Sequence, residues 1–336
     1  MPLIKIIVSL IPAFIFLGLF LYLDSMKLVN QWIVLLCLGW GLLSAGFCFF
    51  INTYLIRHLG ISFDTYSGFV APFVEESIKL LVILWLIYKS RVGFMIDAAI
   101  YGFAVGSAFA FAENIFYLYH FAGTESNLMV WITRGFGTAL MHGGTTAIFG
   151  ILTLSSLNRK SNVLFAVFTG AALAILIHGI YNQFLVSPLV STLIMVVLIP
   201  FSISLTFLSN ERAIRNWLDM EFDSEIKLLR MIRLGRFSQT KSGSFLVSIK
   251  KHYPAPVVFD MYCFISLYIE LSIKAKSLIM LRENDFIIPP DPEVSSKIAE
   301  LHALKKSIGR AGLLAIGPVL RMSQKDLWKI SLLEGK

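Results

Sequence analysis

Six of the ionisable side chains inside the apolar stretches of this sequence are of the types found in hydrolytic sites. They are Glu75, Glu76, Lys79, Glu113, His142 and His178, accompanied by the amides Asn114 and Asn182. An ionised group in a membrane costs roughly 2.5–3.5 kcal/mol on insertion scales, and such groups often mark ion pathways or functional sites. Two histidines and a carboxylate form an adequate ligand set for a divalent metal such as zinc, with one position open for water. A second carboxylate can accept the proton of that water.

The spacing of these residues divides their roles. On a helix, Lys79 lies one turn after both Glu75 and Glu76, so the lysine can neutralise one of the two carboxylates. The other carboxylate then points elsewhere, about 100° around the helix axis. His178 and Asn182 are also one turn apart and share a face. The elements that carry these residues must therefore be helices that face one another.

The composition places these helices in a membrane. The chain is 57% hydrophobic and only 15% charged, with a mean hydropathy of +0.75. These values lie far outside the usual range of soluble domains and indicate a polytopic membrane protein. The N-terminal apolar run lacks a small-residue cleavage site, so we interpret it as an uncleaved first span.

Apolar stretches long enough to cross a bilayer, nominally ~20 residues, predict about seven transmembrane helices in an all-α bundle. They cover about 3–23, 31–56, 69–88, 96–119, 133–155, 163–185 and 188–208. Positive charge in the connecting segments is heavier on the side that the C-terminal region shares. We therefore expect a multi-pass protein of the cell membrane with its N-terminus outside and its C-terminus in the cytoplasm.

The polar residues are predicted to converge at one depth. If the chain crosses alternately, Glu75, Glu76, Glu113, His142 and His178 all lie ~9–14 Å below the same surface, at 1.5 Å per residue. Four helices thus bring ionisable groups to one layer. This agreement depends on alternation and is independent of which side is outside, and it is the strongest argument from the residues for a site.

Three neighbouring features have simpler interpretations. Gly102 and Gly106 form a GxxxG step that lets helices approach closely in lipid, and this contact could also fix the geometry further along the helix. Asp97 is expected at a helix start, bound to unpaired backbone N–H groups. Arg134 is expected at the outer edge of its span with its guanidinium group reaching toward water.

The chain is predicted to divide into a transmembrane bundle over 1–208 and a basic, mainly helical cytoplasmic domain over 209–336. The second part holds 20 of the 29 Lys and Arg and 14 of the 21 Asp and Glu, a net charge of +6. Beside a membrane, such a charge indicates anionic lipid headgroups rather than nucleic acid. Helices are predicted over 209–235, 257–283, 293–308 and 323–334, with a polar loop over 236–256. Charges within 257–283 argue against an eighth span.

The motifs in order resemble those of the PrsW-type intramembrane proteases, relatives of the CAAX prenyl endopeptidases and the bacterial immunity-type membrane proteases. They are Glu75-Glu76-x-x-Lys79, Phe109-x-x-x-Glu113 with Asn114, His142 in a glycine-rich span, and His178-x-x-x-Asn182. The similarity covers about 69–185. CAAX-type relatives have arginine after a longer gap from the paired glutamates and usually histidine where Glu113 stands, so this sequence is more similar to the PrsW branch.

The resemblance implies peptide-bond hydrolysis near or within the membrane. Bacterial members are associated with the cleavage of membrane-bound anti-sigma factors. Carried over by position, Glu75 and Glu76 would include the general base, with Lys79 and Asn114 in support. Metal ligands or oxyanion stabilisers would be Glu113, His142 and His178, with Asn182 assisting. Zinc is the expected metal, and a glutamate-activated water without metal is the alternative mechanism.

We therefore predict a membrane-embedded endopeptidase whose substrate is a membrane protein or peptide. Two other classes of function fit the same residues. Intramembrane Glu, His and Lys also build proton relays in ion-coupled transporters, although this sequence lacks the paired interrupted half-helices of inverted-repeat transporters. A non-catalytic scaffold, in which the glutamate–lysine pair only fixes helix register, is the third.

Overall fold

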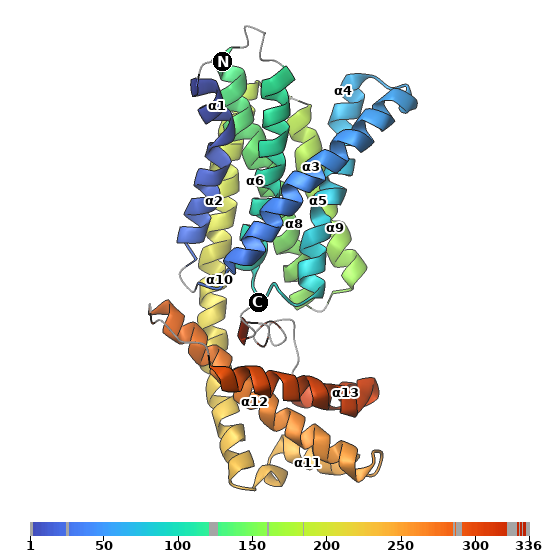
Figure 1. Cartoon of the computed structure of the whole chain (residues 1–336), viewed down its shortest axis with the longest axis vertical. Coiled ribbons are helices and arrows are strands. Elements are labelled where there is room, and N and C mark those ends of the chain that lie inside the picture. Colours follow the sequence, from blue (N-terminus) through green and yellow to red (C-terminus); the bar gives the residue numbers. More distant parts are fainter. Residues whose placement is uncertain are drawn as a thin grey trace. The chain divides into compact units, whose positions relative to one another are not determined.

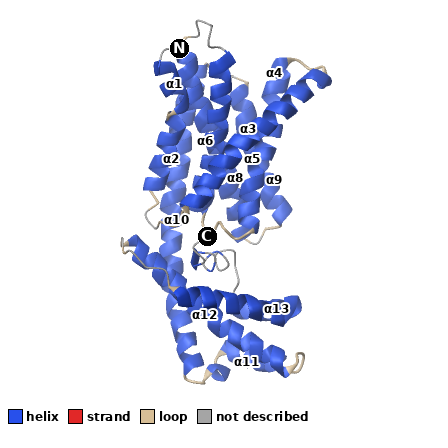
Figure 2. Cartoon of the chain, viewed as in Figure 1, coloured by secondary structure: helices blue, strands red, loops and turns tan. Residues whose placement is uncertain are grey.

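The computed structural model describes residues 3–24, 27–120, 127–159, 161–183, 185–284, 286, 291–320, 328, 330 and 332–333. Within these ranges the secondary structure is helical (Figure 2). The predicted all-α class is confirmed. By its internal contacts the chain divides into two compact units, Met1–Asn210 and Glu211–Lys336.

The first unit is a helical bundle, and each of the seven predicted spans falls on helix. The elements are α1 (Leu3–Leu10), α2 (Pro12–Tyr22), α3 (Gln31–Leu59), α4 (Phe63–Thr65), the π-helical turn η1 (Tyr66–Val70), α5 (Ala71–Tyr88), α6 (Met95–His120), α7 (Leu128–Ile132), the π-helical turn η2 (Thr133–Thr138), α8 (Ala139–Asn158), α9 (Val163–Asn182) and α10 (Pro188–Arg233). Helix α10 continues past Asn210 into the second unit.

Six described helices are long and apolar enough to cross a membrane, or seven if α1 and α2, bent by 40°, form one span. Helix α5 is not among the six, because Glu75, Glu76 and Lys79 place three charges in its 18 residues. The six include 255–282, which the sequence analysis disfavoured as a span because of its charges. Length and composition thus admit this segment, and they agree with a multi-pass membrane protein.

Helix α6 is the core of the first unit (Figure 1), and it packs against α3 and α8. From Ile96 to Ala110 every residue of α6 is buried. The GxxxG step explains how α8 comes so close: a Cβ atom on Gly106 would lie 2.1 Å from the His142 carbonyl oxygen, and one on Gly102 would lie 2.5 Å from that of Thr146. The glycines therefore set the position of His142 as well as the packing.

The start of α6 is capped as predicted. Oδ2 of Asp97 accepts hydrogen bonds from the backbone N–H groups of Gly93 (3.0 Å) and Phe94 (3.1 Å). These groups lie at the helix start, where backbone donors lack partners within the helix. Asp97 is thus a structural residue, whose hydrogen bonds go to the helix start and not to the glutamates or histidines of the motifs.

In the second unit, the predicted polar loop over 236–256 is wrong in part. It contains the 3-10 turn η3 (Phe237–Gln239) and helix α11 (Lys241–Ile249), which begins at a Thr240 cap whose hydroxyl accepts from the Gly243 N–H at 2.9 Å. The capping threonine gave the signal for this helix. Helices α12 (Ala255–Glu283) and α13 (Pro292–Leu320) follow, and the region predicted as helix over 323–334 lies largely outside the described residues.

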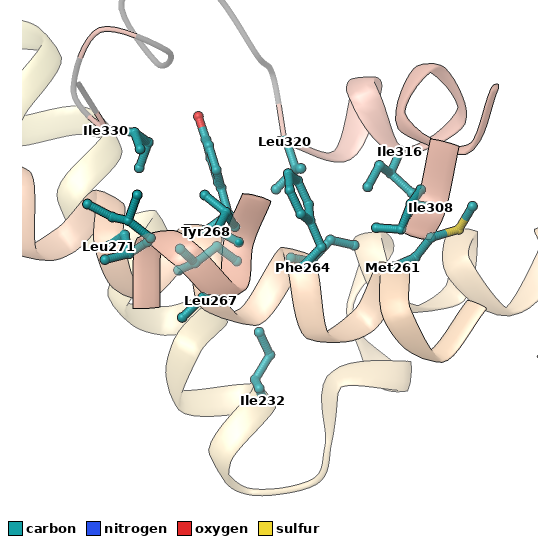
Figure 3. Packing of buried hydrophobic residues seen from close by; sticks show 14 of the residues in the cluster. Ile232, Met261, Phe264, Leu267, Tyr268, Leu271, Ile308, Ile316, Leu320 and Ile330 are labelled. Atoms are coloured by element: carbon teal, nitrogen blue, oxygen red, sulfur yellow. The ribbon is translucent and has the colours of Figure 1, made fainter. Parts of the chain in front are cut away.

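The second unit has its own apolar core (Figure 3). Met261 and Phe264 of α12 pack with Ile308 and Ile316 of α13, and Leu271, further along α12, lies at the other end of the same cluster near Ile330. A buried charge lies in the same unit, because Lys276 of α12 is 0% exposed and its Nζ is 3.1 Å from Oε2 of Glu225.

Candidate active site

Glu76 forms the buried centre of the polar cluster. It lies on α5 and is 0% exposed. Its Oε1 accepts hydrogen bonds from Lys79 Nζ (2.6 Å) and Thr145 Oγ1 (3.2 Å), and lies 2.7 Å from His178 Nδ1. Lys79 therefore neutralises Glu76 rather than Glu75. The spacing of the residues alone could not decide between the two glutamates. Three helices, α5, α8 and α9, meet at one carboxylate oxygen.

His142 connects this centre to Glu113 on α6. Its Nδ1 lies 3.1 Å from Lys79 Nζ, and its Nε2 lies 3.2 Å from Glu113 Oε2. The rings of His142 and His178 meet edge to face with centroids 4.7 Å apart. Phe109, one turn before Glu113, places its ring 5.0 Å below the Lys79 ammonium group. The residues predicted to share one depth thus touch one another.

Arg134 is a site residue that the sequence analysis placed wrongly. Instead of reaching to the membrane surface, its Nη2 lies 3.3 Å from Glu113 Oε1, and its Nε donates to Asn114 Oδ1 at 2.9 Å. The guanidinium carbon stacks 3.6 Å from the Tyr117 ring centroid. Asn114 in turn donates to the Ser9 carbonyl oxygen at 2.8 Å. Asn114 therefore supports Arg134, and Arg134 holds Glu113.

The π-helical turn η2 explains why spacing could not reveal Arg134. Eight residues separate Arg134 from His142, which in a regular α-helix leaves them about 80° apart around the axis. The π turn over Thr133–Thr138 takes up an additional residue and brings both side chains toward Glu113. In the sequence, Gly135 and Gly137 were the available signal for an irregular helix in this segment.

Glu75 points away from Lys79 and is held by residues that the sequence analysis did not name. Its Oε1 accepts from Asn52 Nδ2 at 3.0 Å, and Asn52 Oδ1 accepts from the Tyr66 hydroxyl at 2.7 Å. Its Oε2 is 3.8 Å from His178 Nε2. An isolated asparagine inside the apolar α3 was the available signal for Asn52.

Asn182 anchors the segment that precedes α5. Its Nδ2 donates to the Ser67 carbonyl oxygen at 3.0 Å, within the π-helical turn η1. Helix α9 also approaches this turn at Gly179, where a Cβ atom would lie 2.8 Å from the Gly68 carbonyl oxygen. The predicted His178–Asn182 face therefore exists, with His178 directed to the glutamates and Asn182 to the backbone that positions them.

A cavity of about 560 Å³ opens beside the cluster. Glu75 and Glu113 both line it, together with Asn182 and apolar side chains of α3 and α6. Glu76 and both histidines are not among its lining residues. The two glutamates are therefore the acidic groups that a bound molecule would meet.

Three potential ligand atoms, one each from Glu75, His142 and His178, lie within 4.8 Å of one another and could hold a divalent metal. Catalytic zinc sites use such a set of three and keep a fourth position open. The contact of His178 Nδ1 with Glu76 matches the carboxylate that commonly orients a metal-binding histidine. Glu113, which the sequence analysis assigned as a ligand, lies outside this group.

One contact sets a condition on metal binding. A protonated Lys79 donates to Nδ1 of His142, 3.1 Å away, and a neutral imidazole then carries its proton on Nε2, facing Glu113. In that tautomer Nε2 is a donor and has no lone pair for a metal. A metal bound at Nε2 of His142 therefore requires Lys79 to donate to Glu76 alone.

These features define a class, a polytopic helical membrane protein whose buried glutamates and histidines meet beside an apolar cavity. Residues 30–205 match the model of a family described as PrsW family intramembrane metalloproteases. The chain belongs to the PrsW family, which confirms the resemblance in its motifs. Comparison with curated proteins and with solved structures gives no match. The family is one of intramembrane proteases acting on proteins.

Proposed function

We propose that this protein is an endopeptidase that hydrolyses a peptide bond of a membrane protein within or close to the bilayer. The observation that carries the proposal is the Glu75–Glu113 wall of the apolar cavity, backed by the buried Glu76–His178 and Lys79 contacts. A chamber whose wall combines apolar side chains with two glutamates and several hydroxyl and amide groups fits a peptide substrate taken from the membrane. A membrane-bound signalling regulator such as an anti-sigma factor is a candidate substrate.

We assign a metal, zinc being the leading candidate, to Glu75, His142 and His178. When bound, such an ion supplies a nucleophilic water at neutral pH and polarises the substrate carbonyl. Glu76 fixes the orientation of His178 through Nδ1. Glu113 accepts the proton of the attacking water, because it lines the cavity and lies 3.2 Å from His142. Arg134 holds the Glu113 carboxylate in place.

In a mechanism without metal, Glu113 and His142 would together transfer the proton of the attacking water. In that arrangement Lys79 donates to Nδ1 of His142, and Nε2–H donates to Glu113. The two mechanisms differ in one measurable respect. Only the metal-dependent one predicts a bound ion that depends on Glu75 and His178.

Cleavage and metal content should be measured on the purified full-length protein in detergent, with a single-span membrane protein as substrate. Variants Glu113→Gln and His178→Ala should lose cleavage. Matched controls are Glu300→Gln and His252→Ala, because both residues are exposed in the second unit. Unchanged cleavage in Glu113→Gln and His178→Ala would contradict the site. Metal that is stoichiometric in the wild type and lost in His178→Ala supports the metal-dependent mechanism.

A further inference from the structure

The cavity beside the glutamates is asymmetric in its chemistry. Glu75 and Glu113 line it together with polar side chains that include Asn52, Tyr66 and Asn182. The apolar part of the wall includes Phe109 and Phe116 of α6 and Leu42 and Phe49 of α3, and the rings of Phe49 and Phe116 contact each other with centroids 5.1 Å apart. A molecule bound here would place a polar group at the glutamates and an apolar group against these side chains of α3 and α6.

The volume of the cavity limits its occupant. At about 560 Å³ the cavity is comparable to pockets for small ligands, which measure ~300–1,000 Å³. A transmembrane helix needs ~20 residues to span the bilayer, far more than such a cavity encloses, so only a short part of a substrate lies inside it. The cavity fits a short, extended segment with one large side chain.

Gly46 shapes the wall on α3. Gly46 lines the cavity and is exposed, and a Cβ atom placed on it would meet no atom within 4 Å. Its neighbours Leu42 and Phe49, on the same face of α3, are also exposed at 46% and 46%. The missing side chain therefore leaves space between the outer surface of α3 and the cavity.

We infer that this cavity is a specificity subsite that binds one large apolar side chain of the substrate, of the leucine, methionine or phenylalanine class, next to the bond that is cut. The inference rests on the proposed function and adds the substrate class. The neighbouring backbone of the substrate lies extended along Glu75 and Glu113. Entry is from the lipid side of α3, over Gly46.

The chain offers a matched pair of variants. Gly46→Phe places a ring in the empty space of the cavity wall. Gly39→Phe makes the same change on the same face of α3, two turns earlier, where an added Cβ atom also meets nothing within 4 Å. Gly39 does not line the cavity. Both changes add the same bulk and replace glycine in a helix, so they differ in position alone.

The probe is a short alanine-rich peptide with one central benzoylphenylalanine, photocrosslinked to the full-length protein in detergent and mapped by mass spectrometry. We expect adducts on residues 42–56 and 109–117. Competing peptides with central phenylalanine should suppress the adducts at a concentration about 10-fold or more below that needed with central alanine, as expected for burying a large apolar side chain. Gly46→Phe should lose most of the adduct, and Gly39→Phe should keep it.

Adducts elsewhere, equal competition by the two peptides, or equal labelling of Gly46→Phe and Gly39→Phe would each overturn the inference. Crosslinking needs no hydrolysis, so its outcome is independent of the catalytic assignment. A wild-type protein that crosslinks as expected but cleaves no substrate would count against the proposed function and leave the subsite intact. A protein that cleaves its substrate but forms no crosslinks in the cavity would support the proposed function and overturn the subsite.

Discussion

Oε1 of Glu76 and Nδ1 of His178 lie 2.7 Å apart although the two residues are 102 positions apart in the chain. An ionised carboxylate only accepts hydrogen bonds, so His178 carries its proton on Nδ1. Its other nitrogen, Nε2, is left with a lone pair directed toward Glu75, 3.8 Å away. One contact thus fixes both the orientation and the tautomer of the histidine.

Removing the charge of Glu76 should affect folding and metal together. In Glu76→Gln the buried Lys79 loses its counter-ion, and breaking such a pair costs about 3–5 kcal/mol. Metal affinity should also fall about 10–100-fold, as for other residues that orient a ligand. Thermal unfolding and metal analysis in detergent test both effects. The double variant Glu76→Gln/Lys79→Met should regain much of the stability and none of the activity. Recovery of activity in that variant would contradict the role of Glu76.

Arg134 should act on catalysis through Glu113. Arg134→Gln removes both the ion pair and the stack on Tyr117, and a carboxylate displaced by about 1 Å can lower kcat about 100-fold. Arg134→Lys keeps the charge and loses the planar stack, so its kcat should lie between that of the wild type and that of Arg134→Gln. Steady-state kinetics should place the loss in kcat rather than in KM. The control is Arg215→Lys, because Arg215 forms an exposed ion pair with Glu211 and its substitution should leave the kinetics unchanged. Equal kinetics of Arg134→Gln and wild type would refute the contact.

The approach of α6 to α8 should tolerate no side chain at Gly106. Gly106→Ala puts a Cβ atom on the His142 carbonyl oxygen, and overpacking of this kind costs about 1–3 kcal/mol. The displaced His142 should lower activity further. Gly18→Ala is the control, because a Cβ atom there meets nothing within 4 Å. Unfolding temperature and cleavage rate are the measurements, and a Gly106→Ala protein as stable and active as Gly18→Ala would be incompatible with the helix contact.

The second unit has its own sensitive charge. Glu225→Gln takes the carboxylate away from the fully buried Lys276, so the unit should lose about 3 kcal/mol of stability. Limited proteolysis of the full-length protein should show faster cutting within 211–336. Replacement of the pair by Glu225→Leu and Lys276→Met should restore resistance. As a control, Glu211→Gln alters only an exposed pair and should have little effect.

Orientation can be read by thiol labelling in a background without the native cysteines. With the C-terminus in the cytoplasm, Asn127→Cys should react with a membrane-impermeant maleimide in intact cells. Arg159→Cys should react only after permeabilisation. Both positions are exposed at ends of the Leu128–Asn158 helix. The opposite pattern would invert the predicted topology and place the site near the cytoplasmic surface.

Hydropathy predicted the helices of the first unit and the depth of the polar residues, because both depend on position along a helix axis. It could not predict rotation about that axis. Glu75 and Glu76 occupy almost the same depth, yet only Glu76 contacts Lys79, and Glu75 joins the histidines in the place expected for Glu113. Arg134 was misplaced for the same reason. In the second unit, α11 has only nine residues, and Gly243 together with the prolines that follow it in 236–256 favoured a loop over a helix.

The π-helical turns η1 and η2 stand directly before α5 and α8, the helices that carry Glu76 and His142. Each such turn contains one residue more than a regular helix of the same length needs. Loss of a single residue within Tyr66–Val70 or Thr133–Thr138 would therefore let a regular helix form there without shifting the glutamates or His142 along their helices. In η2, loss of a residue between Arg134 and His142 would also turn Arg134 by about 100° relative to His142, away from Glu113. The additional residue of η2 is thus what allows one helix to present both an arginine and a histidine to the same carboxylate.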